Sequence, residues 1–248
     1  MHATSAGPGG AVRAPKPHAP AAMSFANGDA PSCGVAYPPL VARYLAVTLA
    51  AFMVCGQRET TVMALDSLRV LASTYTWPPE WSTADVQDGV LRRYLAASNN
   101  DDGVAASMLA ETLKWREERG VSDALNSNLA DEVLAELTSR DRCFLCGFDT
   151  SGRPVFYETV DTALISDLTN AVSPEECLWA SIQSMEFMCR CLMPLATRRY
   201  GSPVAQFVHV LDLGGISWSG LSHAPVLQLF KSWAAISQAH YPELVAKI

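Results

Sequence analysis

The feature that most constrains the fold is a nearly continuous apolar run, Ala205–Leu213 (AQFVHVLDL), which ends at Gly214 and Gly215. A strand without polar alternation is typical of a strand that is covered on both faces, as in a largely parallel sheet. Helical patterns lie on either side of it in the sequence, one beginning near Ser173 and the other near Ala224. The sequence therefore predicts an α/β fold in which these helices cover both faces of a central strand.

The two flanking helices have recognisable ends. The first begins at the capping box Ser173–Glu176, with a proline at its first helical position, and is predicted to run until it meets Pro194. The second begins near Ala224 and is stopped by Pro242. Both carry apolar side chains at helical spacing, namely Leu178, Ile182, Met185, Cys189 and Leu192 in the first and Val226, Phe230 and Trp233 in the second.

A helical lobe and a hairpin precede these elements. Helices are predicted over about 83–98, 102–120 and 129–138, with Thr83 and the Asn99–Asp102 turn as caps and Gly120 as a stop. The apolar runs Cys143–Phe148 and Pro154–Val160 then enclose a short turn, which predicts a β-hairpin. This order indicates a helical lobe in front of an α/β domain.

The first 80 residues have a different composition. Residues 1–40 are rich in alanine, proline and glycine with few large apolar groups, which predicts disorder. The uncharged run Tyr44–Gly56 is too short to span a bilayer. It is interpreted first as a buried helix; a signal-type apolar core after a start at Met23, or an unnatural N-terminal extension, are alternatives. The predicted organisation is 1–40 disordered, 41–80 a helical extension, 81–140 the helical lobe and 141–248 the sheet domain.

Composition excludes some functions. The net charge is −7 and no block of lysine and arginine exists, so no nucleic acid partner is expected. Cys143 and Cys146, with Cys189 and Cys191, have spacings that a four-thiolate zinc site could use. However, residues three apart on a strand face opposite sides, as do residues two apart on a helix, so free buried thiols are the preferred interpretation. Neither a metal nor a cofactor is predicted.

Several stretches, in this order, resemble the CRAL-TRIO family of lipid-exchange proteins. They are Leu91–Leu95 with Leu113–Gly120, the hairpin Asp149–Tyr157, the helix that meets Pro194 and Gly201, and Val210–Ser217 with Ser237–Glu243. The resemblance covers roughly residues 85–248 and does not reach residues 1–80. Each motif is weak alone, and their shared order and spacing carry the resemblance.

The resemblance implies a sheet floored by helices that encloses one phospholipid or other hydrophobic ligand, with a mobile helix as a gate. It implies binding and transfer or presentation of phospholipids between membranes by a non-enzymatic cytoplasmic protein that contacts membrane surfaces transiently. A lipid-sensing or scaffold module without transfer activity is an alternative. Protein partners are not predicted.

Headgroup contacts carry over from the phospholipid-transfer members by position. Their two serines that contact the phosphate of phosphatidylcholine match Ser217 and Ser219, and an assisting aromatic residue matches Phe156, which lacks the hydroxyl. Tyr157 is adjacent and is expected to point to the other face of the strand. The alternative interpretation of both serines is ordinary turn capping after a strand.

The chain also departs from the family pattern. The arginine that contacts the phosphate in phosphatidylinositol-binding members corresponds to Ser98, so recognition of phosphatidylinositol is expected to be poor. A tyrosine of the phosphatidylcholine site corresponds to Leu145. The family's next strand, gate helix and closing elements are expected past Ile248, so the chain is interpreted as truncated, with an unpaired strand edge and inefficient lipid carriage.

A second alternative is an α/β-hydrolase fragment. The segment Gly214–Gly220 follows a strand and precedes a helix, as a nucleophile elbow does, but Ser219 replaces the second glycine of that motif. His209 lies within the strand, before the serines. A core histidine whose hydrogen bonds are satisfied is therefore the preferred interpretation, and no catalytic residue is predicted.

Overall fold

The computed structural model describes residues 62–140 and 143–247. The predicted disorder of residues 1–40 and the predicted helix Tyr44–Gly56 lie outside these ranges. Within them the chain has the mixed α/β architecture that the sequence predicts, with helices in front of a four-stranded sheet. The helices are α1 Val62–Ala72, α2 Ala84–Ala97, α3 Asp102–Arg119, α4 Asp131–Ser139, α5 Thr162–Ala171, α6 Pro174–Phe187, α7 Met193–Tyr200, α8 Trp218–Leu221 and α9 Ala224–His240. The strands are β1 Cys143–Phe148, β2 Pro154–Asp161, β3 Phe207–Gly215 and β4 Val245–Lys247.

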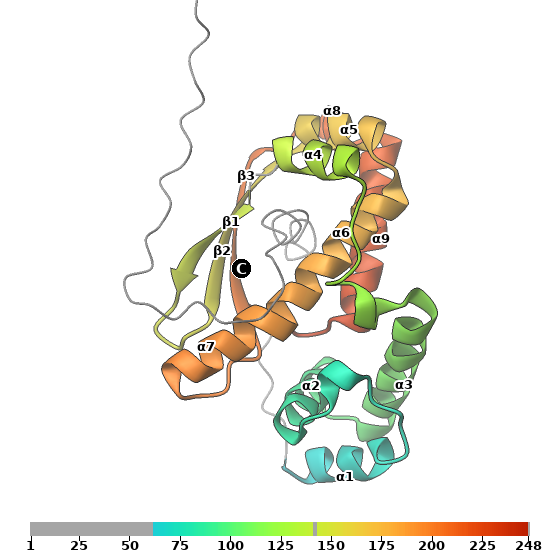
Figure 1. Cartoon of the computed structure of the whole chain (residues 1–248), viewed down its shortest axis with the longest axis vertical. Helices are drawn as coiled ribbons and strands as arrows, with labels where there is room; N and C mark the ends of the chain where they lie inside the picture. Colours follow the sequence, from blue (N-terminus) through green and yellow to red (C-terminus); the bar gives the residue numbers. More distant parts are fainter. Residues whose placement is uncertain (1–61, 141–142, 248) are drawn as a thin grey trace, which may run out of the picture. The chain divides into compact units, whose positions relative to one another are not determined.

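The strand order of the sheet is β1-β2-β3-β4. β1 and β2 pair antiparallel, which confirms the predicted hairpin, and the Asp149 carboxylate accepts hydrogen bonds from the backbone N–H groups of Ser151 and Arg153 in the turn. β2 pairs with β3, and β3 with β4, in parallel. Parallel neighbours need crossover connections. Helices α5, α6 and α7 make the first, and α8 and α9 make the second (Figure 1).

β3 is central in the sheet, as predicted, but helices cover one of its faces. Phe207 and His209 are buried on the inner face, and Phe207 belongs to the same core as side chains of α6 and α9. On the outer face Val210 is 40% exposed. Figure 1 shows α6 and α9 on one side of the sheet. The expectation that these two helices cover opposite faces is therefore wrong, because both join the core on the Phe207 side.

The strand that follows helix α9 is β4, and it is part of this sequence. β4 pairs with the start of β3, so that Val208 has Val155 of β2 as its partner on one side and Lys247 of β4 on the other. The expectation that this strand begins past Ile248 is therefore wrong. The predicted unpaired edge of β3 is also wrong at the start of that strand, where the backbone is paired on both sides.

The helical lobe is a small core of its own. Helix α1 packs against α2 and α3, so the core of the lobe includes residues before its predicted start at residue 81. The Asp101 carboxylate caps α3 by accepting from Val104 N–H, and Gly120 ends α3 with a positive φ of 63°. The predicted cap Thr83 occupies the N-cap position of α2 without a side-chain hydrogen bond. The buried members of this core are Leu65, Leu68, Ala72, Trp81, Val90, Leu91, Tyr94, Leu95, Ala105, Ala106 and Leu109.

The helices between β2 and β3 differ partly from the prediction. The capping box at Ser173 is present and opens α6, as predicted. Helix α5, capped by Asp161, was not expected. The helical path also continues past Pro194, because a π-helical segment, Met188–Leu192, leads from α6 into α7. Pro194 lies in the first turn of α7, where a missing N–H breaks no hydrogen bond within that helix.

A buried ion pair joins α3 to α6. The Arg116 guanidinium donates to both Glu186 carboxylate oxygens, at 2.7 and 2.8 Å, and these residues are 2% and 1% exposed. Arg116 also pairs with Glu80 and lies over the Trp81 ring. Tyr241, directly after α9, donates its hydroxyl hydrogen to Glu186 at 2.8 Å. We call this set the Arg116 cluster: Arg116, Glu80, Glu186 and Tyr241.

Candidate functional site

Ser217 and Ser219 lie together in the turn after β3. Their hydroxyl oxygens are 3.3 Å apart, and both side chains are exposed. The Ser217 oxygen is 3.1 Å from the hydroxyl of Thr162, the first residue of α5. Thr162 lies 55 residues earlier in the chain, and the pairing of β2 with β3 brings it here. The three residues form a small group of hydroxyls at the carboxyl end of β3, and we call this group the hydroxyl cluster.

Glycines allow this close approach. A Cβ atom on Gly215 would lie 2.6 Å from the carbonyl oxygen of Val160, and one on Gly220 would overlap the Thr162 side chain. Both positions therefore favour glycine because the turn after β3 packs against the end of β2 and the start of α5. Ser217 also caps α8, since its side chain accepts from Gly220 N–H. The predicted turn-capping role is thus present for Ser217.

Exposed apolar residues lie next to the two serines in the sequence. Leu213 is 47% exposed, Ile216 is 37% exposed, and Trp218, between the two serines, is 87% exposed. Hydroxyl groups beside exposed apolar groups form an amphipathic surface. Such a surface matches a molecule that has a polar headgroup next to hydrocarbon.

Phe156 lies away from the serines. It is buried on the inner face of β2, where its ring meets Phe207 edge-on at 5.7 Å between ring centroids. Along β2, Phe156 is five residues before Asp161, which pairs with Gly215. At about 3.3 Å per residue this separation is roughly 17 Å. Phe156 therefore does not contribute to the hydroxyl cluster.

Tyr157 points to the outer face, as the strand alternation predicts. Its hydroxyl donates to the Asp212 carboxylate at 3.0 Å, and its ring lies 5.2 Å from that of Phe144. The face that holds Tyr157 is opposite to the one that holds Phe156. The four residues expected to contact a headgroup are thus divided, with the two serines together and the two aromatic residues on opposite faces of β2.

Ser98, the position of the expected arginine, is part of the turn between α2 and α3. It is buried, and its one hydroxyl hydrogen can be donated to the carbonyl oxygen of Leu95 or of Asp101, which lie 3.1 and 2.8 Å away. A long cationic side chain here would lose this hydrogen bonding and would need a new path to solvent. Ser98 therefore stabilises the turn between α2 and α3.

The residues considered for hydrolysis do not come together. His209 is buried, and its Nε2 is 2.9 Å from a carboxylate oxygen of Glu158 rather than near Ser217 or Ser219. The prediction that His209 lies in the core is confirmed, but the expectation that its hydrogen bonds are satisfied is wrong for Nδ1, which has no partner. Cys143 is buried and Cys146 is exposed, as expected for opposite faces of one strand, and neither forms a disulfide.

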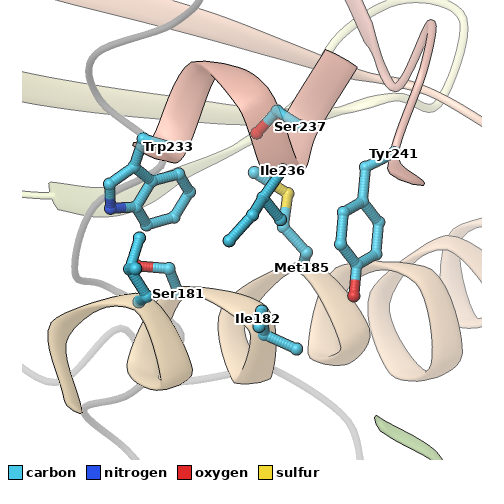
Figure 2. A pocket seen from close by; sticks show the side chains of 8 residues that line it. Ser181, Ile182, Met185, Trp233, Ile236, Ser237 and Tyr241 are labelled. Carbon is cyan, nitrogen blue, oxygen red and sulfur yellow. The ribbon is translucent and has the colours of Figure 1, made fainter. Parts of the chain in front are cut away.

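A shallow recess separates α6 from α9 (Figure 2). Figure 2 shows Trp233, Ile236 and Tyr241 on one side facing Ser181 and Met185 on the other. Its volume of about 190 Å³ includes space open to solvent, whereas ligand pockets usually measure about 300–1,000 Å³. The recess is therefore too small for a lipid. Among residues 62–140 and 143–247, no helix has the length and apolarity needed to cross a membrane.

Comparison with known proteins finds similarity to one domain family over part of the chain. Residues 139–248 match the family model of the CRAL/TRIO domain. The chain is 29% identical over 167 residues to a CRAL-TRIO domain-containing protein of Saccharomyces cerevisiae, covering 65% of this chain and 53% of that protein. It is 27% identical over 173 residues to the SEC14 cytosolic factor of Eremothecium gossypii, covering 66% of this chain and 53% of the relative.

A solved structure agrees with these matches. The crystal structure of Sfh5 aligns with a TM-score of 0.55 at 16% identity, covering 75% of this chain and 68% of that one, which supports the fold. The chain spans about half the length of the curated relatives it matches. Residues 139–248 are thus similar to the CRAL/TRIO domain, and the fold of the described residues agrees with that similarity.

Proposed function

We propose that this protein binds a single phospholipid or other hydrophobic molecule and transfers it between membranes or presents it. The observation that carries the proposal is the CRAL-TRIO match over the whole sheet domain, together with the similarity to SEC14 cytosolic factors. The name of the SEC14 cytosolic factors favours a cytoplasmic protein. Exchange of lipid with a membrane would require transient contact with its surface.

The surface after β3 supports a contact with a headgroup. Ser217 and Ser219 have exposed hydroxyls that can donate to phosphate oxygens, and Leu213 and Trp218 offer apolar contact beside them. A hydrogen bond to a charged group contributes about 1.5–3 kcal/mol, and each buried methylene of an acyl chain about 0.8 kcal/mol. Hydroxyls would therefore select the headgroup, while acyl chain burial would supply most of the affinity.

The hydroxyl cluster favours a zwitterionic phospholipid such as phosphatidylcholine over phosphatidylinositol. Its donors are uncharged, and Ser98 stands where phosphatidylinositol-binding relatives are expected to carry an arginine. The hydroxyl of Ser98 is already held within its turn. Restoring an arginine there should therefore harm the turn between α2 and α3 as well as add a charge, so Ser98→Arg is a poor test of headgroup choice.

Lipid uptake by the full chain tests the proposal. The chain is incubated with vesicles of phosphatidylcholine or of phosphatidylinositol and separated by size, and the bound lipid is identified by mass spectrometry. We expect phosphatidylcholine at up to one molecule per chain and about tenfold weaker binding when Ser217→Asn and Ser219→Ala are combined. The Asn variant keeps a side chain that can cap α8.

Ser222→Ala is the matched control, because Ser222 is an exposed serine in the next turn whose hydroxyl donates to the backbone of Trp218. It should bind as the unmodified chain does. A folded full chain that takes up neither lipid contradicts the proposal. If the control and the double variant lose lipid binding to the same extent, the two serines are not part of the headgroup site. Movement of labelled lipid from donor to acceptor vesicles distinguishes transfer from presentation.

A further inference from the structure

Three side chains with metal-binding atoms meet on the inner face of the sheet. Cys143, Glu158 and His209 come from the adjacent strands β1, β2 and β3. Cys143 is directly opposite Glu158, while His209 pairs with Phe156 and is thus a diagonal neighbour of Glu158 on the same face. One donor atom from each residue lies within 4.8 Å of the other two. We call this set the inner-face triad.

The triad is fully inside the protein. His209 is 0% exposed, and Glu158 and Cys143 are also buried. One imidazole nitrogen, Nε2, is 2.9 Å from Glu158, but Nδ1 is buried without a hydrogen-bond partner. Buried polar atoms usually have partners, and an unpaired one costs about 1–3 kcal/mol. The contacts of the folded chain therefore leave the imidazole only partly satisfied, and its one lone pair is shared with Glu158 alone.

Burial leaves the triad uncharged when it holds no ion. Loss of water raises the pKa of the Glu158 carboxyl well above its usual value, and a hydrogen bond with Cys143 opposes this only in part. Burial lowers the pKa of His209 to about 4, so that its ring is neutral near pH 7. A protonated Glu158 can then donate to Nε2. The site therefore contains a thiol, a carboxylic acid and a neutral imidazole.

We propose that Cys143, Glu158 and His209 bind one zinc ion, with a water molecule as the fourth ligand. Binding forms one bond each from Zn²⁺ to sulfur, oxygen and nitrogen, and it releases the thiol proton and the carboxyl proton to solvent. The charges of the ion, the thiolate and the carboxylate then sum to zero, which removes the cost of an unpaired charge in the interior.

The dimensions and donor types favour zinc. Zinc binds sulfur at about 2.3 Å and nitrogen or oxygen at about 2.0–2.2 Å, which places tetrahedral donors about 3.3–3.6 Å apart. Donors that already lie within 4.8 Å reach this arrangement by small side-chain movements. A thiolate with an imidazole suits zinc and disfavours calcium and magnesium, which prefer oxygen ligands. The spacing of the cysteines in the sequence does not predict this site, because its other two ligands, Glu158 and His209, lie on separate strands.

Metal titration of the full chain tests the site. The reduced protein is stripped with a chelator and titrated with Co²⁺ as a spectroscopic probe, and the cobalt is then displaced with Zn²⁺. We expect one ion per chain, a sulfur-to-cobalt charge-transfer band and a higher unfolding temperature with zinc. Cys143→Ala should lower zinc affinity at least about 100-fold and abolish the band. Cys146→Ala is the matched control, because Cys146 is an exposed cysteine on the same strand, and it should change neither result.

Alkylation of the unmodified chain gives a second readout that needs no variant. Under mild denaturant, zinc should slow the alkylation of Cys143 and leave that of Cys146 unchanged, as mass spectrometry of peptides would show. Absence of binding by the unmodified chain, or equal binding by Cys143→Ala, would overturn the proposal and leave a neutral hydrogen-bonded pair. Zinc that protects both cysteines equally would also overturn it, since binding would then not be specific to the triad.

Discussion

The Arg116 cluster and the inner-face triad are both buried polar groups, but they are balanced in different ways. In the Arg116 cluster, Arg116 and Glu186 form a bidentate ion pair, and the hydroxyl of Tyr241 donates to the same carboxylate. In the inner-face triad, a carboxyl and an imidazole share one hydrogen bond, and an imidazole nitrogen has no partner.

This difference follows from the partners available at each place. Burial alone would lower the pKa of Arg116, but its hydrogen bonds to Glu186 raise that pKa above the ordinary value, so the guanidinium stays charged. Glu158 and His209 instead avoid charge, because burial shifts both pKa values toward the neutral forms. A substitution that removes charge should therefore lower the free energy of unfolding strongly in the Arg116 cluster and only slightly in the inner-face triad.

The largest effect is expected from Arg116→Met. The substitution leaves Glu186 buried without its cation, and breaking a buried pair in this way costs about 3–5 kcal/mol. Urea unfolding of the full chain measures the change in free energy. Arg119→Met is the matched control, because Arg119 lies on the same helix and pairs with Glu175 on the surface. It should cost less than about 1 kcal/mol. Similar losses for both variants would contradict the structural role assigned to Arg116.

A smaller effect is expected from Tyr241→Phe. The hydroxyl of this buried residue donates to Glu186, and losing a hydrogen bond to a charged group costs about 1.5–3 kcal/mol. The same unfolding experiment measures it. Tyr157→Phe provides the comparison, since Tyr157 also donates to a carboxylate, that of Asp212, but on the outer face of the sheet. If the Tyr157 variant proves the less stable of the two, burial does not determine how much these hydrogen bonds contribute to stability.

His240, which lies near the charge of Arg116, makes the stability of the protein depend on pH. Burial, and then the charge of Arg116, lower the pKa of His240 to about 4, and its ring stacks on Trp115 while Nδ1 lies 3.1 Å from the Thr112 hydroxyl. A histidine in the unfolded chain has a pKa of about 6.5. Between these values the unfolded state binds a proton that the folded state excludes. His240 therefore lowers stability as the pH falls from about 6.5 toward 4.

Because His240 is half-buried, this loss should be on the order of 1 kcal/mol. Unfolding curves at about pH 7 and about pH 4.5, for the full chain and for His240→Gln, isolate it from other titrating groups. The variant should lose less stability than the unmodified chain on acidification. Identical losses would show that His240 takes up its proton in the folded state as readily as in the unfolded one.

Local patterns in the sequence were sufficient for much of the fold. The capping box at Ser173 opens α6, and the apolar runs on either side of the Asp149 turn form the hairpin. Helix α5 was missed because its segment Thr162–Ala171 is rich in serine, threonine and asparagine, which have weak helix propensity. The short strand β4 was missed because three residues give too little pattern, and pairing with β3 rather than propensity defines it.

In the candidate sites, too, sequence patterns find residues that are close along the chain and miss contacts between distant residues. Ser217 and Ser219 are near neighbours in sequence, so a motif could find them, and the structure places them together. Thr162 joins them through the pairing of distant strands, which no single-sequence pattern shows. Arg116 and Glu186 are 70 residues apart, and the inner-face triad depends on the register of β1, β2 and β3. Contacts of this kind follow from topology and register.

The smallest effect, and the sharpest contrast between the two clusters, is expected from Glu158→Gln in protein kept free of metal. Glutamine has the shape of a protonated glutamate, its amide can donate to His209 Nε2 and its carbonyl oxygen can accept from Cys143. The triad would keep its hydrogen bonds and its neutrality, so the free energy of unfolding should change by less than about 1 kcal/mol.

Glu186→Gln is the same substitution in the Arg116 cluster and serves as the control. It removes the carboxylate that receives both hydrogen bonds from Arg116, so it should cost about 3 kcal/mol or more when measured by urea unfolding in the same buffer. The difference between these two values measures how differently the two buried carboxyl groups are balanced. If Glu158→Gln costs as much as Glu186→Gln, then Glu158 and His209 form a charged pair in the folded protein, and burial in the two places is balanced in the same way.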